Sequence, residues 1–215
     1  MHLPDGFLSA PVWTSCWGAA ALGLSVCIRK TQEALQEKMV PLMGVMCAFV
    51  FAAQMLNFPI LGGTSGHLLG GVLAAVLLGP CAAVIVLACV LTVQCLVFQD
   101  GGLTALGANI FNMALIGTLG GYFVFYGVYR AFGTRKGFFV AVALGAWISV
   151  VLASVACAFE LGLSGTVELK RVLWVMAGVH ALIGAGEALI TAFVVEFVAR
   201  ARPDLVAGLQ GKTSL

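Results

Sequence analysis

The chain has 215 residues, of which 61% are hydrophobic and only 9% are charged, and its formal net charge is +2. A soluble globular domain carries roughly 25% charged residues, so this composition excludes a water-soluble enzyme. The small net charge also excludes a nucleic-acid-binding domain, which needs a basic surface. Because the mean hydropathy is +1.08, we expect an all-α integral membrane protein.

Long uncharged segments predict most of the membrane helices, because a helix needs about 20 apolar residues to cross a bilayer core. In chain order they cover approximately residues 8–28, 40–57, 105–129, 137–159 and 172–195. The apolar stretch 67–98 is too long for one helix, and Gly79-Pro80 interrupts it. If it forms two helices, the first of them, 67–78, is only about 18 Å long and cannot cross the bilayer alone.

The basic residues decide between six and seven spans, since Lys and Arg gather in cytoplasmic loops. With 67–98 divided into two helices, the N-terminus lies outside, the C-terminus lies inside, and nine of the eleven basic residues lie on the inner side. The nine are Arg29, Lys30, Lys38, Arg130, Arg135, Lys136, Arg200, Arg202 and Lys212, against Lys170 and Arg171 outside. A single helix would divide them between the two sides, so we predict about seven transmembrane helices.

The start of the chain, MHLPDGFLSAPVW, has no Lys or Arg ahead of its apolar segment and no clear cleavage site. We therefore do not expect a secretory signal peptide. Methionine aminopeptidase generally spares Met before a bulky residue, so we expect Met1 and its α-amine to remain ahead of His2.

His67 is expected at the outer end of the short third helix, and an ionisable residue at membrane depth is a candidate functional group. The preceding segment, 58–66, is rich in Gly, Pro, Ser and Thr. Such a segment cannot face lipid, because its main-chain N–H and C=O groups would lack partners. We therefore expect the 58–66 loop and the N-terminal segment to dip into a cavity at the outer face, with His67 inside it.

A free α-amine followed directly by histidine can chelate a metal ion. The amine of Met1, the amide nitrogen of His2 and Nδ1 of His2 close a five-membered and a six-membered ring around one ion, and His67 could supply a fourth nitrogen. A square-planar nitrogen set suits Ni(II) or Cu(II) better than Zn(II), and does not exclude Co(II). Because the amine and imidazoles bind only when deprotonated, we expect affinity to fall as pH drops through about 6–7.

Four further polar residues are candidates for holding these ligands in place, as outer partners do in many metal sites. They are Asn57, Ser65, Asn109 and Asn112. Asn109 and Asn112 are three residues apart and share one helix face. Hydrogen bonds between helices explain these two asparagines equally well.

His180 and Glu187 lie on one face of the last helix, seven residues apart. They could form an intramembrane polar pair that relays protons or metal, although a structural bond between helices is favoured. A stand-alone secondary permease for divalent metal is the alternative function. It would need such deep ligands together with inverted repeats, and no repeat is evident.

Four motifs make the sequence resemble the CbiM/NikM family, the substrate-binding (S) components of energy-coupling factor transporters for cobalt and nickel. They are MHLPDGFLSAPVW at the start, GGTSGHLLGG at 62–71, QDGGLTALGANIFNM at 99–113 and HALIGAGEA at 180–188, and the resemblance extends over residues 1 to about 198. It implies a seven-helix fold in which the Met1 amine, His2 and His67 hold the metal. It also implies a transmembrane coupling (T) subunit and ATPase subunits as partners, and leaves open a small accessory membrane subunit.

No phosphate-binding loop is present, because GLQGKT at 208–213 has two residues between its glycines where four are needed. We therefore expect a non-enzymatic chain that binds no nucleotide and depends on ATPase partners. The prediction is one transmembrane metal-capture domain, 1–202, with a short polar cytoplasmic tail, 203–215. It would lie in the plasma membrane of a prokaryote and capture Ni²⁺ or Co²⁺ from outside, with nickel favoured.

Overall fold

The computed structural model describes residues 1–34, 37, 39–56, 58–60 and 64–206, with only the backbone of 58–60, 64 and 65. The helices are α1 (Ala10–Ala34), α2 (Met39–Gln54), α3 (Gly71–Leu78), α4 (Pro80–Phe98), α5 (Leu106–Asn109), the π-helix η1 (Ile110–Gly117), α6 (Thr118–Phe132), α7 (Arg135–Leu163), α8 (Leu169–Ala201) and the 3-10 turn η2 (Pro203–Leu205). The strands are β1 (Phe58–Ile60) and β2 (Thr64–Gly66).

The long helices confirm an all-α membrane fold. Five helical stretches are long and apolar enough to cross a bilayer, namely α1, α4, the continuous stretch Leu106–Phe132, α7 and α8. The apolar helix α2 is shorter, at 16 residues. Together with α3, these stretches correspond one to one with the seven predicted segments. The orientation in the membrane stays a prediction, as do the domain 1–202 and the tail, of which 207–215 lie outside the described residues.

Helix α3 can be short because the other helices, and not lipid, surround it. All eight of its residues are buried, and it contacts α2, α4, α6, α7 and α8. It ends where Gly79 adopts a φ of +87°, a conformation that favours glycine, and Pro80 begins α4. The predicted break at Gly79-Pro80 is therefore confirmed, and the protein interior replaces the bilayer around a helix too short to span it.

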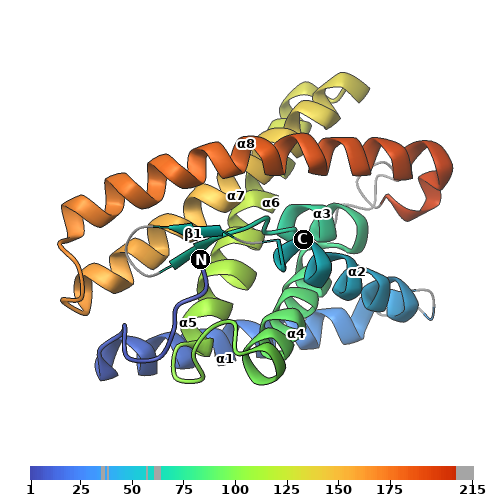
Figure 1. Cartoon of the computed structure of the whole chain (residues 1–215). Helices are drawn as coiled ribbons and strands as arrows, with labels where there is room; N and C mark the ends of the chain where they lie inside the picture. Colours follow the sequence, from blue (N-terminus) through green and yellow to red (C-terminus); the bar gives the residue numbers. More distant parts are fainter. Residues whose placement is uncertain (35–36, 38, 57, 61–63, 207–215) are drawn as a thin grey trace.

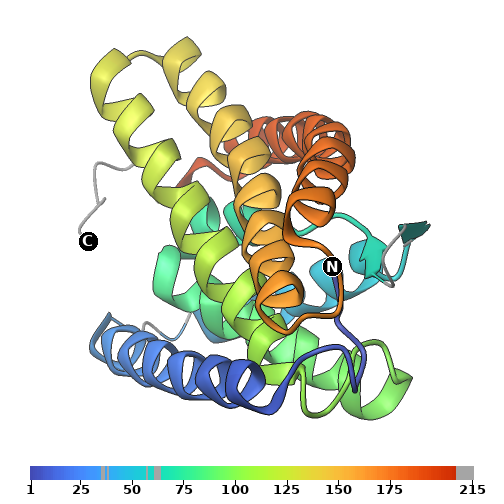
Figure 2. The same cartoon turned by 90° about the vertical axis from the view of Figure 1, so that its left-hand side faces the viewer.

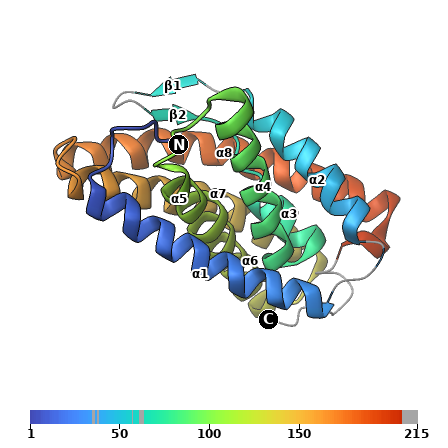
Figure 3. The ribbon, with the colours of Figure 1, turned by 90° about the horizontal axis from the view of Figure 1, so that it is seen from below.

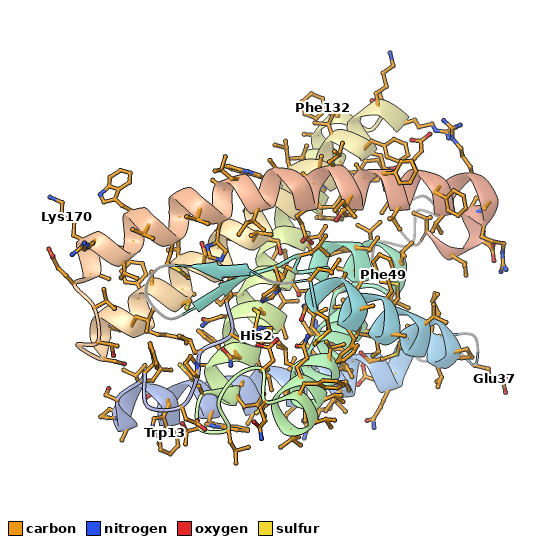
Figure 4. The ribbon with its side chains drawn as sticks, viewed as in Figure 1. His2, Trp13, Glu37, Phe49, Phe132 and Lys170 are labelled. Atoms are coloured by element: carbon orange, nitrogen blue, oxygen red, sulfur yellow. The ribbon has the colours of Figure 1, made fainter. Side chains whose placement is uncertain are left out.

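The helices lie around α3 and α4, with α1 and α8 on opposite sides (Figure 1). Helix α7 packs along α8 and α6, and α1 packs against α4 and α5. Lys170 and Glu37 lie at opposite ends of the molecule, and His2 lies between them among the helices (Figure 4). The chain start thus enters the protein instead of extending away from it.

The segment expected as an irregular loop over 58–66 contains an antiparallel hairpin. Phe58 pairs with Gly66, and Ile60 pairs with Thr64. The hairpin lies at the edge of the helices, beside the N-terminus (Figures 2 and 3). Because the main-chain groups of the two strands bind one another, this segment forms a hairpin and not an irregular loop. The interior next to His67 is occupied by the N-terminal segment.

Candidate metal centre

The first residues of the chain are packed into the interior together with His67. Met1 is fully buried, His2 is 5% exposed and His67 is 1% exposed. The two imidazole rings are stacked, with their centroids 4.6 Å apart and an angle of 28° between their planes. The structure therefore brings together the three residues predicted as metal ligands, although they come from positions 65 residues apart in sequence.

Hydrogen bonding leaves one nitrogen of the His2 ring available. Nε2 lies 3.1 Å from Oε1 of Gln94, and a carbonyl oxygen can only accept, so Nε2 carries the proton. Nδ1 then has a lone pair, and it makes no hydrogen bond to the described residues. It lies 3.4 Å from Oδ1 of Asp100. Nδ1 is the nitrogen that closes a six-membered chelate ring with the amide nitrogen of the same residue.

His67 presents the opposite nitrogen. Its Nδ1 donates to the carbonyl oxygen of Leu68 at 2.8 Å, which places the lone pair on Nε2. Nε2 is buried and has no hydrogen-bond partner among the residues that the structure describes. Burying a polar atom without a partner is unfavourable, so both imidazoles carry a nitrogen suited to a ligand.

Hydrogen bonds from α5 and its preceding loop hold the N-terminal segment in place. The side chain of Asn109 accepts from the N–H of Leu3 at 2.8 Å and donates to its carbonyl at 3.2 Å. Gly102 donates to the same carbonyl at 2.8 Å. The carboxylate of Asp5 accepts from the main-chain N–H and the hydroxyl of Thr104, and these bonds lower the pKa of Asp5. The chain start is thus anchored on both sides of Pro4.

A second set of hydrogen bonds fixes the segment that follows His67. The carboxylate of Glu187 accepts from the N–H of Leu69 at 2.6 Å and from the N–H of Gly70 at 2.7 Å. Gln54 donates to the carbonyl of Leu69 at 2.8 Å. A carboxylate from α8 and an amide from α2 therefore hold the backbone immediately after the imidazole.

The other predicted polar residues have different surroundings. His180 Nδ1 donates to the carbonyl of Met176 within the same helix, at 2.8 Å, whereas Glu187 accepts from the main chain of Leu69 and Gly70. Asn112 donates to Glu160 at 2.6 Å, and not to the N-terminal segment. Asn57 lies outside the described residues, and only the backbone of Ser65 is described, within β2.

Burial makes the proposed ligands poor bases. Desolvation lowers the pKa of the Met1 amine from 8.0 to about 5 and that of His2 from 6.5 to about 3. The same cause holds the pKa of His67 well below its ordinary value. All three groups are consequently neutral at pH 7, and each has a lone pair for a metal ion without first losing a proton.

Three polar residues near the site were missed in the sequence. Gln94 and Asp100 face His2, and Glu160 accepts from Asn112 and from the thiol of Cys16, at 3.1 Å. Gln94 could have been found as an amide in a predicted membrane helix. Glu160 lies one residue beyond the predicted span 137–159, so the apolar run gives no sign that its side chain is buried.

Apolar helices that enclose two imidazoles beside a buried chain start define a multi-pass membrane protein with a candidate metal-binding site. Residues 2–205 match the family model CbiM, the cobalt uptake substrate-specific transmembrane region. The chain therefore belongs to the CbiM family of metal-transport proteins, which confirms the predicted resemblance.

Among similar proteins is the "Putative fused nickel transport protein NikMN" of Archaeoglobus fulgidus, 44% identical over 96% of this chain and 68% of its own length. Another is the fused nickel transport protein NikMN of Rhodobacter capsulatus, 35% identical over 96% of this chain and 64% of its own length. A crystal structure of a truncated transition metal transporter superposes with a TM-score of 0.85 at 36% identity, covering 94% of this chain and 99% of the other. Prokaryotic relatives and apolar helices together confirm a multi-pass plasma-membrane protein.

Proposed function

We propose that this chain is the substrate-capture subunit of an ATP-driven uptake transporter, and that it binds one Ni²⁺ or Co²⁺ near the outer face. The donors are the amine of Met1, the amide nitrogen and Nδ1 of His2, and Nε2 of His67. The observation that carries the proposal is the pair of stacked, buried imidazoles, each with a nitrogen that makes no hydrogen bond to described residues, beside the buried Met1.

The chemistry of this donor set favours nickel. Two imidazole nitrogens are too few for a four-coordinate ion, and the main chain supplies the other two donors, the amine of Met1 and the amide nitrogen of His2. Loss of the amide proton of His2 places a negative charge next to the ion and keeps three nitrogens in one plane. Planar nitrogen ligands suit Ni(II), while Co(II) accepts them less readily. Both metals are substrates here, and neither is a resident cofactor.

Partner subunits would supply the energy for uptake. The sequence offers no nucleotide-binding loop over 208–213, so ATP would be hydrolysed by separate ATPases and coupled through a T subunit. The fused relatives are longer than this chain, which spans 68% and 64% of them. Their additional length and their fused names support a further partner module in transporters of this kind.

The test of the proposed function is metal uptake in a bacterial host that lacks its own nickel and cobalt importers. The chain is produced alone, or together with T and ATPase subunits. We expect uptake of radioactive Ni²⁺ to require the partners, and to disappear when the ATPase is made inactive. Equal uptake by the chain alone would contradict ATP-driven capture and would favour the stand-alone permease.

The lowered pKa values lead to a prediction about protons. At pH 7 the amine and both imidazoles are already neutral, so metal binding should release only about one proton, from the amide of His2. A free Met-His peptide, whose amine has an ordinary pKa near 8, should release about two. Protons were expected to compete with the metal ion for the amine and imidazoles at pH 6–7. With the lowered pKa values this competition begins only below about pH 5, where protonation of Met1 would weaken binding further.

Calorimetric titration of Ni²⁺ in buffers of different ionisation enthalpy measures the number of protons released. The Met-His peptide serves as the comparison at the same pH. Release of two or more protons from the protein at pH 7 would show that the amine is charged in the metal-free state, and would contradict the prediction.

A further inference from the structure

Asp100 lies where α4 gives way to the following loop, and the backbone there adopts an uncommon conformation. Gln99, at the end of α4, has a φ of +56°, in the left-handed region that residues other than glycine rarely adopt. The N–H of Asp100 donates to the carbonyl of Gln94 at 3.0 Å. The end of α4 therefore fixes the position of Asp100, and strained conformations of this kind cluster at functional sites.

The carboxylate of Asp100 faces the proposed donors. Its Oδ1 is 3.4 Å from Nδ1 of His2, and Nδ1 has a lone pair because Nε2 donates to Gln94. Two acceptor atoms thus face each other, an arrangement in which a cation between them is favourable. The carboxylate also acts electrostatically on the Met1 amine, which is another of the four donors.

Asp100 is more exposed to solvent than the proposed nitrogen donors are. The side chain of Asp100 is 20% exposed, whereas that of His2 is 3% exposed, and Met1 and His67 are buried. A hydrated ion that reaches this part of the protein therefore meets the carboxylate before it meets any of the nitrogens.

We propose that Asp100 is an entry ligand, whose carboxylate binds the hydrated Ni²⁺ or Co²⁺ first and passes the ion to Nδ1 of His2. This inference rests on the proposed function, because it needs the nitrogen site as the destination. In the entry step a metal–water bond breaks, a metal–carboxylate bond forms and the water returns to solvent, with no transfer of protons or electrons. Carboxylate oxygen accepts many divalent ions, so the choice of metal is left to the nitrogen donors.

The test compares the full-length protein with its Asp100→Asn variant in detergent, by stopped-flow mixing with Ni²⁺ and by competition with a chelator. We expect both the association and the dissociation rate constants to fall by about tenfold, because the ion leaves by the route through which it enters. Asp100→Glu keeps the carboxylate and is expected to restore most of the association rate. Thermal unfolding reports whether each variant folds, and Asp100→Ser replaces the Asn variant if it does not.

Glu168→Gln is the matched control, since it removes the same charge from an exposed position at the start of α8. It should leave both rates within about twofold of wild type, because solvent and salt screen an exposed charge. Three results would overturn the entry role: an unchanged association rate in Asp100→Asn, a faster dissociation with an altered absorption spectrum of the bound ion, or an equal effect of the control. Binding that does not depend on His2 and His67 would instead overturn the proposed function.

Discussion

A single alanine added ahead of Met1 is expected to lower the affinity for Ni²⁺ by more than about a hundredfold. This loss is larger than the roughly ten- to hundredfold loss that follows when a residue bonded to a metal ligand is replaced. Alanine remains as the first residue when an initiator methionine is removed, so the amine moves by one residue. The nitrogen of Met1 then becomes a peptide amide, and the chelate with His2 loses its amine. Met1 is fully buried, and Leu3 is anchored by three hydrogen bonds, so the extended chain cannot easily slide outward to compensate.

Calorimetric titration of the full chain in detergent measures this loss. The matched control carries the same alanine after Leu215, at the other end of the chain, and should bind as the unmodified protein does. His67→Ala removes a side-chain donor without altering the chain start, and should weaken binding by a similar factor. If the extended protein kept its affinity while His67→Ala lost it, the amine would not be a ligand.

The helices and the candidate ligands could be predicted from local features of the sequence. Apolar runs indicate membrane helices because the bilayer imposes a length on them, and the break at Gly79-Pro80 follows from the geometry of those two residues. The chelate of Met1 and His2 depends on adjacent residues. The sequence could not show that the ring of His67 stacks on that of His2, since this contact results from the packing of α3 among the other helices.

The residues that hold the site were harder to predict, because their partners are main-chain groups far away in the sequence. A structural bond was favoured over a pair of His180 with Glu187, and each of these side chains does bind main-chain groups, but the sequence did not show which ones. Asn109 was recognised as a candidate, although its partner, the backbone of Leu3, has no sequence signal.

The π-helix η1 was also missed. It interrupts the apolar run 105–129, and within it Asn112 reaches Glu160 of α7. The hydroxyl of Thr118 donates to the carbonyl of Met113, five residues earlier, at 3.0 Å. Such a wide turn depends on local bonds and neighbouring helices, and the hydrophobic pattern does not distinguish it from an α-helix.

Glu187→Gln is expected to lower both the stability of the protein and its affinity for Ni²⁺. A carboxylate can accept from both Leu69 and Gly70, whereas an amide offers one acceptor oxygen and directs its NH₂ group at the other N–H. One buried N–H would lose its partner, which should lower the free energy of unfolding by about 1–3 kcal/mol. The backbone after His67 would also be less well held, so metal affinity should fall by roughly ten- to a hundredfold.

Unfolding by SDS from mixed micelles measures the stability, and calorimetry measures the affinity. Glu196→Gln is the control on the same helix, since Glu196 makes an exposed pair with Arg200, and such pairs contribute little. This control should change the free energy of unfolding by less than about 0.5 kcal/mol and leave metal binding unaltered. Stability and affinity that are equal in Glu187→Gln and the control would mean that the Glu187 carboxylate does not hold the site. A loss of stability with unchanged affinity would mean that His67 keeps its position without the carboxylate. The hairpin and the bond from Gln54 to Leu69 would then be sufficient to place the imidazole beside His2.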